Sequence, residues 1–341
     1  MQLLLDAALL KKPEALASWQ TFLQQNDIQT IEHSALVLLP LVYRNLQEES
    51  HPLCKSIYRH TWVSNQSQWA NALPTLNKLL DAGIEKIGIL KGMALILDHY
   101  RDFGVRVIGD IDILIDPYHA PLAHSLLLDW GWRCVLPRFD PKNPFQLSRW
   151  HAVNYIHPSG LNLDLHWSLI LESTPALTKE ILKGIPPGIH SLDPTDLFFQ
   201  TCIRGNKKST APLIRWVPDA LTLLSHSSVD FPRLFKLAED HHVTLSLSSA
   251  LTYLTKSFGA TIPPFNPQTS PYEVREFRAN LRGNIYLAGY YRARLRNHSL
   301  IHYLQHTANL TSPWMIPFYA PCWVCSRLYR FLKKRLRSIS S

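Results

Sequence analysis

The segment GVRVIGDIDILIDP, residues 104–117, places two aspartates inside an otherwise apolar run. Its content of Val and Ile predicts a β-strand over residues 105–116. Side chains of a strand alternate between its two faces, so Asp110 and Asp112 are expected on one face and the isoleucines on the other. Two carboxylates on one face repel each other unless a cation lies between them. The segment therefore predicts a cation site on a strand of the core.

A third carboxylate occurs in the same kind of setting further along the chain, in LNLDLHWSL, residues 161–169. Asp164 alternates there with leucines, as expected for a strand with one face in a core. If the two strands are neighbours, Asp164 completes a cluster of three carboxylates, the ligand type that Mg²⁺ or Mn²⁺ prefers. His166 shares the face of Asp164, and we interpret it as a hydrogen-bonded structural histidine. Asp116, which precedes Pro117, is instead interpreted as a turn or helix-cap residue.

The segment LKGMAL, residues 90–95, has the composition of a turn between a strand and a helix. Gly92 allows the backbone to approach a ligand closely, and Lys91 adds a positive charge beside it. Both residues are candidates for binding phosphate. Arg106 lies four residues before Asp110 and shares its strand parity. Two roles are open for Arg106: contact with a triphosphate, or an ion pair with one of the acids.

The pattern of hydrophobic residues changes twice along the chain. Helical spacing over residues 1–80 predicts an N-terminal helical region. Residues 81–190 predict a mixed core, with strands at 85–92 and 105–116, a helix at 93–102 and a β-hairpin at 152–170. Helical spacing returns over 191–300, and residues 301–341 form a basic, aromatic tail. The predicted fold class is α+β, with a mixed sheet between two helical regions.

Composition indicates a packed globular chain, because 46% of the 341 residues are hydrophobic and 18% are charged. The net charge of +9 is unevenly distributed. Residues 271–341 carry ten Arg and two Lys against two Glu, a net charge of +10, so the rest of the chain is close to neutral. No recognised nucleic-acid-binding motif is present, and nucleic acid is not an expected partner.

The tail WMIPFYAPCWVCSRLYRFLKKRLRS, residues 314–338, allows two interpretations. Aromatic residues followed by a cluster of Lys and Arg suit a peripheral contact with an anionic membrane. The same pattern suits a final helix that packs on its own domain with the basic side in water. The large side chains of Trp314, Phe318 and Trp323 favour packing on the domain.

The expected compartment is the cytoplasm, with a membrane-peripheral location as the alternative that the tail offers. The five cysteines are odd in number and scattered, and the N-terminus lacks the pattern of a signal peptide. No stretch of about 20 apolar residues predicts a membrane-spanning helix.

The quoted segments together resemble an uncharacterised bacterial nucleotidyltransferase-like family of the DNA polymerase β superfamily. In that superfamily a Gly-containing turn precedes a D-x-D pair, and a third acid lies on a later strand. The segment LKGMALILDHYRDFGVRVIGDIDILID, residues 90–116, followed by LDLHW, residues 163–167, carries this order. The segment LIRWVPDALTLL, residues 213–224, is also similar to the family's helical region. The resemblance extends over residues 10–330.

The resemblance implies a metal-dependent enzyme that moves a nucleoside monophosphate group from a nucleoside triphosphate (NTP) to an acceptor hydroxyl. The acceptor can be a small molecule, a sugar, a peptide or a protein, and the base of the NTP and the oligomeric state stay open. By position, the metal-binding and catalytic residues it implies are Asp110, Asp112 and Asp164, with Mg²⁺ or Mn²⁺ as cofactor. The nucleotide-binding residues that it implies are Lys91, Gly92 and Arg106.

An inactive protein of the same fold, acting in binding or as a scaffold, is the alternative function. Its motivation is Met93, which follows Gly92 where the superfamily turn usually carries Gly-Ser or Gly-Gly. Retention of the three acids favours the enzyme, because an inactive site has no reason to keep like charges together.

Overall fold

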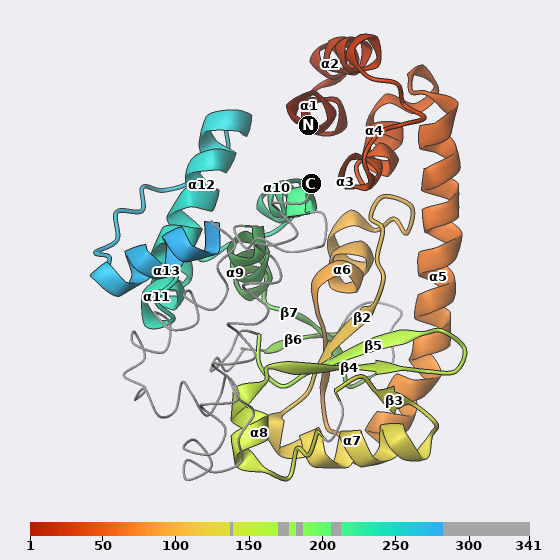
Figure 1. The fold of residues 1–341 in the computed structure, drawn as a ribbon, viewed down its shortest axis with the longest axis vertical. Coiled ribbons are helices and arrows are strands. Elements are labelled where there is room, and N and C mark those ends of the chain that lie inside the picture. Colours follow the sequence, from red (N-terminus) through yellow and green to blue (C-terminus); the bar gives the residue numbers. More distant parts are fainter. Residues whose placement is uncertain (137–138, 170–176, 182–186, 206–212, 282–341) are drawn as a thin grey trace, which may run out of the picture. The chain divides into compact units, whose positions relative to one another are not determined.

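A computed structural model describes residues 1–136, 139–169, 177–181, 187–205 and 213–281. The chain divides into two compact units, Met1–Gln268 and Thr269–Ser341. The first holds the predicted N-terminal helical region, the predicted core and the predicted C-terminal helical region as far as Gln268 (Figure 1). In the second, the structure describes helix α13 (Pro271–Leu281). The basic tail, with its membrane and packing interpretations, lies outside the described residues.

The N-terminal region is helical, as predicted. Its helices are α1 (Gln2–Leu9), α2 (Lys12–Gln25), α3 (His33–Leu36), α4 (Leu39–Leu46) and α5 (Pro52–Asp81), with a 3₁₀ turn η1 (Gln47–Glu49) before α5. Helix α5 has 30 residues and continues through Pro74. Its buried residues recur every three or four positions, for example Asn65, Trp69, Ala72, Leu76 and Leu79. This buried stripe explains how the helix tolerates an internal proline, which removes one backbone hydrogen bond.

The central sheet has seven strands within the described residues. They are β1 (Ile87–Ile89), β2 (Ile111–Leu114), β3 (Arg133–Cys134), β4 (Ala152–Ile156), β5 (Asn162–His166), β6 (Leu177–Ile181) and β7 (Ile189–Leu192). Their order in the sheet is β3-β4-β5-β2-β1-β7-β6. The pairs β2–β5 and β1–β7 are parallel and the other pairs are antiparallel. The expected α+β class with a mixed sheet is therefore confirmed.

Helices cover the sheet and close the first unit. They are α6 (Lys91–Ala94) with the π-helical turn η2 (Leu95–Tyr100), η3 (Pro117–His119) with α7 (Ala120–Asp129), α8 (Pro144–Arg149), α9 (Pro194–Gly205), η4 (Leu213–Arg215) with α10 (Trp216–His226), α11 (Phe231–Asp240) and α12 (Thr244–Phe258). In Figure 1, α6 lies on one side of the sheet and α7 on the other, while α5 runs alongside. Asp116 caps η3 through a hydrogen bond from the Tyr118 backbone N–H, as interpreted from the sequence.

The structure differs from the predicted elements in two respects. The strand expected over residues 105–116 is limited to β2, Ile111–Leu114. The reason is that residues 103–107 are held in a loop by other elements: Asn65 of α5 donates to the carbonyls of Phe103 and Arg106 at 2.7 Å each, and Arg215 donates to that of Val107. These bonds occupy the backbone groups that a longer strand would need. In addition, strands β6 and β7 were not predicted from the sequence.

The hydrophobic core of the first unit packs against both faces of the sheet. Ile111, Ile113, Leu163 and Leu165 are fully buried. The predicted hairpin of β4 and β5 is confirmed, with its turn at residues 157–161. Among the described residues, Cys54, Cys134 and Cys202 carry free thiols. No helix of the described part is long and apolar enough to cross a membrane.

Candidate metal and nucleotide site

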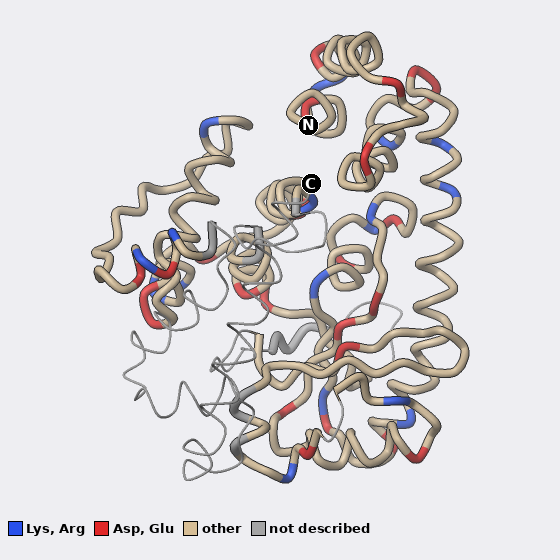
Figure 2. The backbone as a smooth tube through the Cα atoms, in the orientation of Figure 1, with Lys and Arg blue, Asp and Glu red and all other residues tan. Residues whose placement is uncertain are grey.

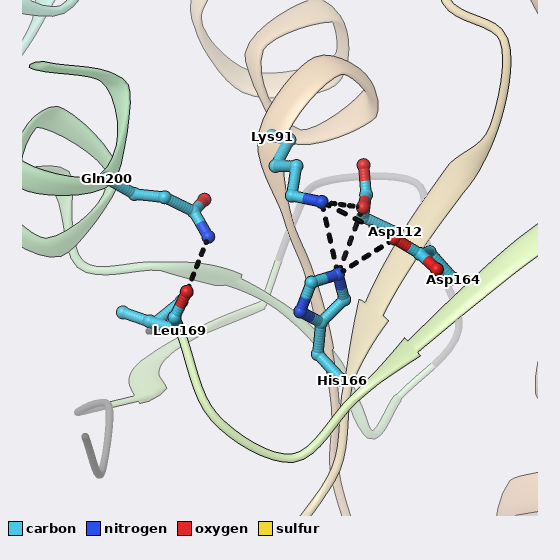
Figure 3. A network of polar contacts seen from close by, with 6 residues as sticks. All are labelled: Lys91, Asp112, Asp164, His166, Leu169 and Gln200. Carbon is cyan, nitrogen blue, oxygen red and sulfur yellow. Dashed lines mark hydrogen bonds and ion pairs between the residues drawn. The ribbon is translucent and has the colours of Figure 1, made fainter. Parts of the chain in front are cut away.

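Strands β2 and β5 lie side by side and in register, which brings two acids from distant segments together. Asp112 of β2 is paired with Asp164 of β5 in the parallel ladder. Residues paired in this way project to the same face, so the two carboxylates lie next to each other (Figure 3). Figure 2 shows acidic positions, in red, close together on the neighbouring backbones of β2 and β5. The condition set by the sequence, that the two strands be neighbours, is met.

His166 belongs to the same cluster, because it follows Asp164 by two residues on β5 and therefore shares its face. The His166 side chain is 1% exposed. Its Nε2 lies 3.1 Å from Asp112 Oδ1 and 3.4 Å from Asp164 Oδ2 (Figure 3). The sequence placed His166 on the correct face but assigned it a structural role, since a single histidine in a strand gives no signal of its chemistry.

Lys91 supplies the positive charge in the cluster. Its Nζ contacts Asp112 Oδ1 in a close ion pair, and lies 3.1 Å from His166 Nε2 and 3.6 Å from Asp164 Oδ2 (Figure 3). Lys91 is the first residue of α6 and has φ +48°, in the left-handed region that is unfavourable for residues other than glycine. The ion pairs with the two acids offset this backbone cost and fix where the ammonium lies.

The charge of Lys91 determines the ionisation state of the Asp112 carboxyl. Burial by itself raises the pKa of this carboxyl, but the Lys91 charge and the adjacent His166 ring lower it more, so that the pKa lies well below its usual value. Asp112 is therefore a carboxylate although its side chain is only 5% exposed. Asp164, at 21%, is the more accessible of the two acids.

The cluster has the donor atoms of a metal site. Asp112, Asp164 and His166 each offer one ligand atom, and these atoms lie within 4.8 Å of one another. Two ligand atoms that each lie about 2.0–2.2 Å from one divalent ion can be at most about 4.4 Å apart. His166 Nε2 lies 3.1 Å and 3.4 Å from oxygens of the two acids, so the residues fit a metal ion. Asp110 is not a member of this group. It directly precedes β2, so the strand that was expected to carry both acids begins after Asp110, and its role at the metal stays a prediction.

The turn before the acids is built around Arg106. Its guanidinium makes two bonds of 2.9 Å and one of 3.1 Å to the carboxylate of Asp219 in α10. Tyr100 donates a further bond of 3.0 Å to Asp219. A Cβ on Gly92 would overlap Arg106 Nη1 and would lie 2.6 Å from Ile108 Cγ2. Arg106 was expected to contact a triphosphate or to pair with one of the clustered acids; the ion pair that the structure shows is instead with Asp219 of α10.

The sequence analysis gave Asp219 no role at the site. Its signal was present: a single acid in the apolar helix WVPDALTLL, residues 216–224. Met93 lies in the hydrophobic core at 1% exposure. The residue that follows Gly92 is therefore a packing residue of this core.

The comparison with protein families decides the identity. A family model described as uncharacterised nucleotidyltransferase matches residues 18–259. The chain belongs to this nucleotidyltransferase family. The match spans α5, the sheet and the helices up to α12, and so includes every residue of the cluster. Searches of curated proteins and of solved structures found no similar protein.

Membership confirms the resemblance and the enzyme class expected from the sequence. A nucleotidyltransferase takes a nucleoside triphosphate as substrate, and such enzymes generally use divalent metal ions. The cluster of Asp112, Asp164 and His166 is the candidate metal centre of this nucleotidyltransferase. Lys91, which contacts all three residues, links that centre to the turn at Gly92.

Proposed function

We propose that this nucleotidyltransferase moves a nucleoside monophosphate from an NTP to a hydroxyl group of an acceptor, with Mg²⁺ or Mn²⁺ as cofactor. The observation that carries the proposal is the pairing of Asp112 with Asp164 across β2 and β5, with a cationic group held between them. A bound metal ion would neutralise phosphate charge and polarise the attacking hydroxyl.

The residues of the chain have distinct parts in this proposal. Asp112 and Asp164 hold the metal, and Asp110, two residues earlier, is proposed to act with them. Lys91 and Gly92 face the phosphates, and Arg106 supports that turn from behind through its bonds to Asp219. Most of the catalysis in such a site comes from positioning and charge neutralisation.

The transfer forms one bond at the α-phosphorus and breaks another. The acceptor hydroxyl oxygen forms a bond to the α-phosphorus, the bond from that phosphorus to the bridging oxygen breaks, and pyrophosphate leaves. The hydroxyl proton passes to a carboxylate. Asp164 is proposed for this role because it is more exposed than Asp112, whose lowered pKa makes it a poor proton acceptor.

The acceptor class is best found by direct labelling. Pure protein is incubated with each NTP labelled at the α-phosphate, Mg²⁺ or Mn²⁺, and a cell lysate separated into small-molecule and protein fractions. We expect a labelled adduct in one fraction and release of unlabelled pyrophosphate. Asp164→Asn should abolish the adduct, while Asp116→Asn, a matched change at the exposed cap of η3, should not.

Three results would count against the proposal. They are an adduct that still forms with Asp164→Asn, a label that appears from the γ-phosphate instead, and NTP binding without any adduct. The last result would support the binding or scaffold function. Met93, which motivated that alternative, packs in the hydrophobic core.

A further inference from the structure

We infer that the metal ion held between Asp112 and Asp164 is also coordinated by a nitrogen atom, His166 Nε2, and that the site takes a divalent transition-metal ion in preference to Mg²⁺. The inference rests on the proposed function and specifies its cofactor. Sequence reasoning predicted oxygen ligands alone. The difference matters chemically, because Mg²⁺ binds oxygen ligands whereas imidazole nitrogen favours transition-metal ions.

The first argument is geometric. His166 Nε2 lies 3.1 Å from one carboxylate oxygen of Asp112 and 3.4 Å from one of Asp164. Ligand atoms of one tetrahedral or octahedral ion have separations of about 3–3.5 Å when each bond is near 2.1 Å. The ring is 1% exposed, so it has little freedom to turn away from the two acids.

The second argument comes from Lys91. Its ammonium lies 3.1 Å from His166 Nε2, the ring nitrogen that also faces both carboxylates. The same ammonium contacts Asp112 and Asp164. All three donor groups therefore already converge on one positive charge, which is the requirement for coordinating a metal ion.

The third argument concerns what must happen to Lys91. The ammonium lies among the three ligand atoms, and a metal ion bound by them would repel it at close range. Metal binding therefore displaces Lys91 from the acids. Its ammonium then becomes available to the phosphates of the NTP, the role that the sequence predicted for it.

The test is Mn²⁺ binding followed by electron paramagnetic resonance. Mn²⁺ is a demanding probe, because it binds nitrogen and oxygen ligands least tightly among the first-row divalent ions. We expect the spin-echo spectrum of bound Mn²⁺ to contain ¹⁴N modulation from a coordinated imidazole. The modulation should be lost in His166→Gln and kept in His157→Gln, a matched change at the turn of the same hairpin. Labelling the wild-type protein with ¹⁵N-histidine should alter the modulation. This test does not depend on whether His166→Gln folds.

The affinity for Mn²⁺ is a second measurement, and it should change in opposite directions in two variants. His166→Gln should weaken Mn²⁺ binding about tenfold or more, since even outer-shell partners of metal ligands contribute about 10–100-fold. It should also reduce the preference for Mn²⁺ over Mg²⁺. Lys91→Met should strengthen Mn²⁺ binding to the free protein, because no ammonium has to be displaced.

Bound Mn²⁺ without ¹⁴N modulation would overturn the inference, and so would unchanged affinity and selectivity in His166→Gln or an absence of Mn²⁺ binding. These outcomes are separate from a failure of the proposed function. Transfer activity with oxygen-only Mn²⁺ would refute the inference alone. Nitrogen-coordinated Mn²⁺ without any transfer would refute the proposed function alone.

Discussion

Arg106 and Asp219 are 113 residues apart in the chain and form a two-pronged ion pair in the protein interior. The Arg106 side chain is 14% exposed and that of Asp219 is 5%. The pair joins the loop before β2 to helix α10, and the guanidinium packs against Gly92 at the start of α6. The C-terminal helical region is therefore tied directly to the turn that carries Lys91.

Loss of one partner of this pair should strongly destabilise the protein. Asp219→Asn leaves the Arg106 charge buried without its counter-ion, which typically costs about 3–5 kcal/mol in the free energy of unfolding. Urea denaturation measures it. Lys12→Met, which breaks the exposed pair with Glu49, is the control and should cost at most about 1 kcal/mol. Equal losses in the two variants would show that burial of the Arg106 pair has no energetic consequence.

Gly92→Ala should destabilise the protein through a steric clash. The added Cβ would overlap Arg106 Nη1 and approach Ile108 Cγ2, so that the ion pair with Asp219 must shift. Overpacking of this kind costs about 1–3 kcal/mol in the free energy of unfolding. Gly109→Ala is the matched control, because a Cβ there meets no atom within 4 Å. If both variants unfold at the same urea concentration, Gly92 is not required by packing.

Metal ions should stabilise the fold through the acids of the cluster. A ligand that binds only the native state at 100 times its dissociation constant adds about 2.7 kcal/mol to the free energy of unfolding. We therefore expect Mn²⁺ to raise the Tm and a chelator to reverse the increase. Asp164→Asn should remove the effect and Asp116→Asn should keep it. A Tm increase that survives Asp164→Asn would locate the metal elsewhere.

Lys91 should contribute to NTP binding through its position rather than its charge alone. Lys91→Met removes a charged hydrogen bond to phosphate, a loss of about 1.5–3 kcal/mol, so NTP should bind more than tenfold more weakly. Lys86→Met removes the same charge from an exposed position four residues before Leu90 and should have little effect. Calorimetric titration with NTP in the presence of metal compares the two. Equal weakening would mean that the turn at Gly92 does not contact phosphate.

The sequence alone determined the local features of the site. Asp112 and Asp164 each alternate with Leu or Ile in the sequence. Because side chains of a strand alternate between two faces, this pattern predicted that each strand has one face in a core. The hairpin, the cap at Asp116 and the α+β class followed from equally local patterns. Where a local pattern was overridden, the cause was tertiary: β2 is short because Asn65 and Arg215 hold the preceding loop.

Only the tertiary structure decided which of these residues meet. The parallel pairing of β2 with β5 is a contact between segments about 50 residues apart, and strand order in a sheet has no local signal. That pairing brings His166 to the acids and leaves Asp110 at the edge of the strand. Likewise, the partner of Arg106 lies on α10, because a buried guanidinium must be neutralised by whichever carboxylate the packing of helices brings to it. Periodicity fixes the face on which a side chain lies, whereas long-range packing selects its neighbours.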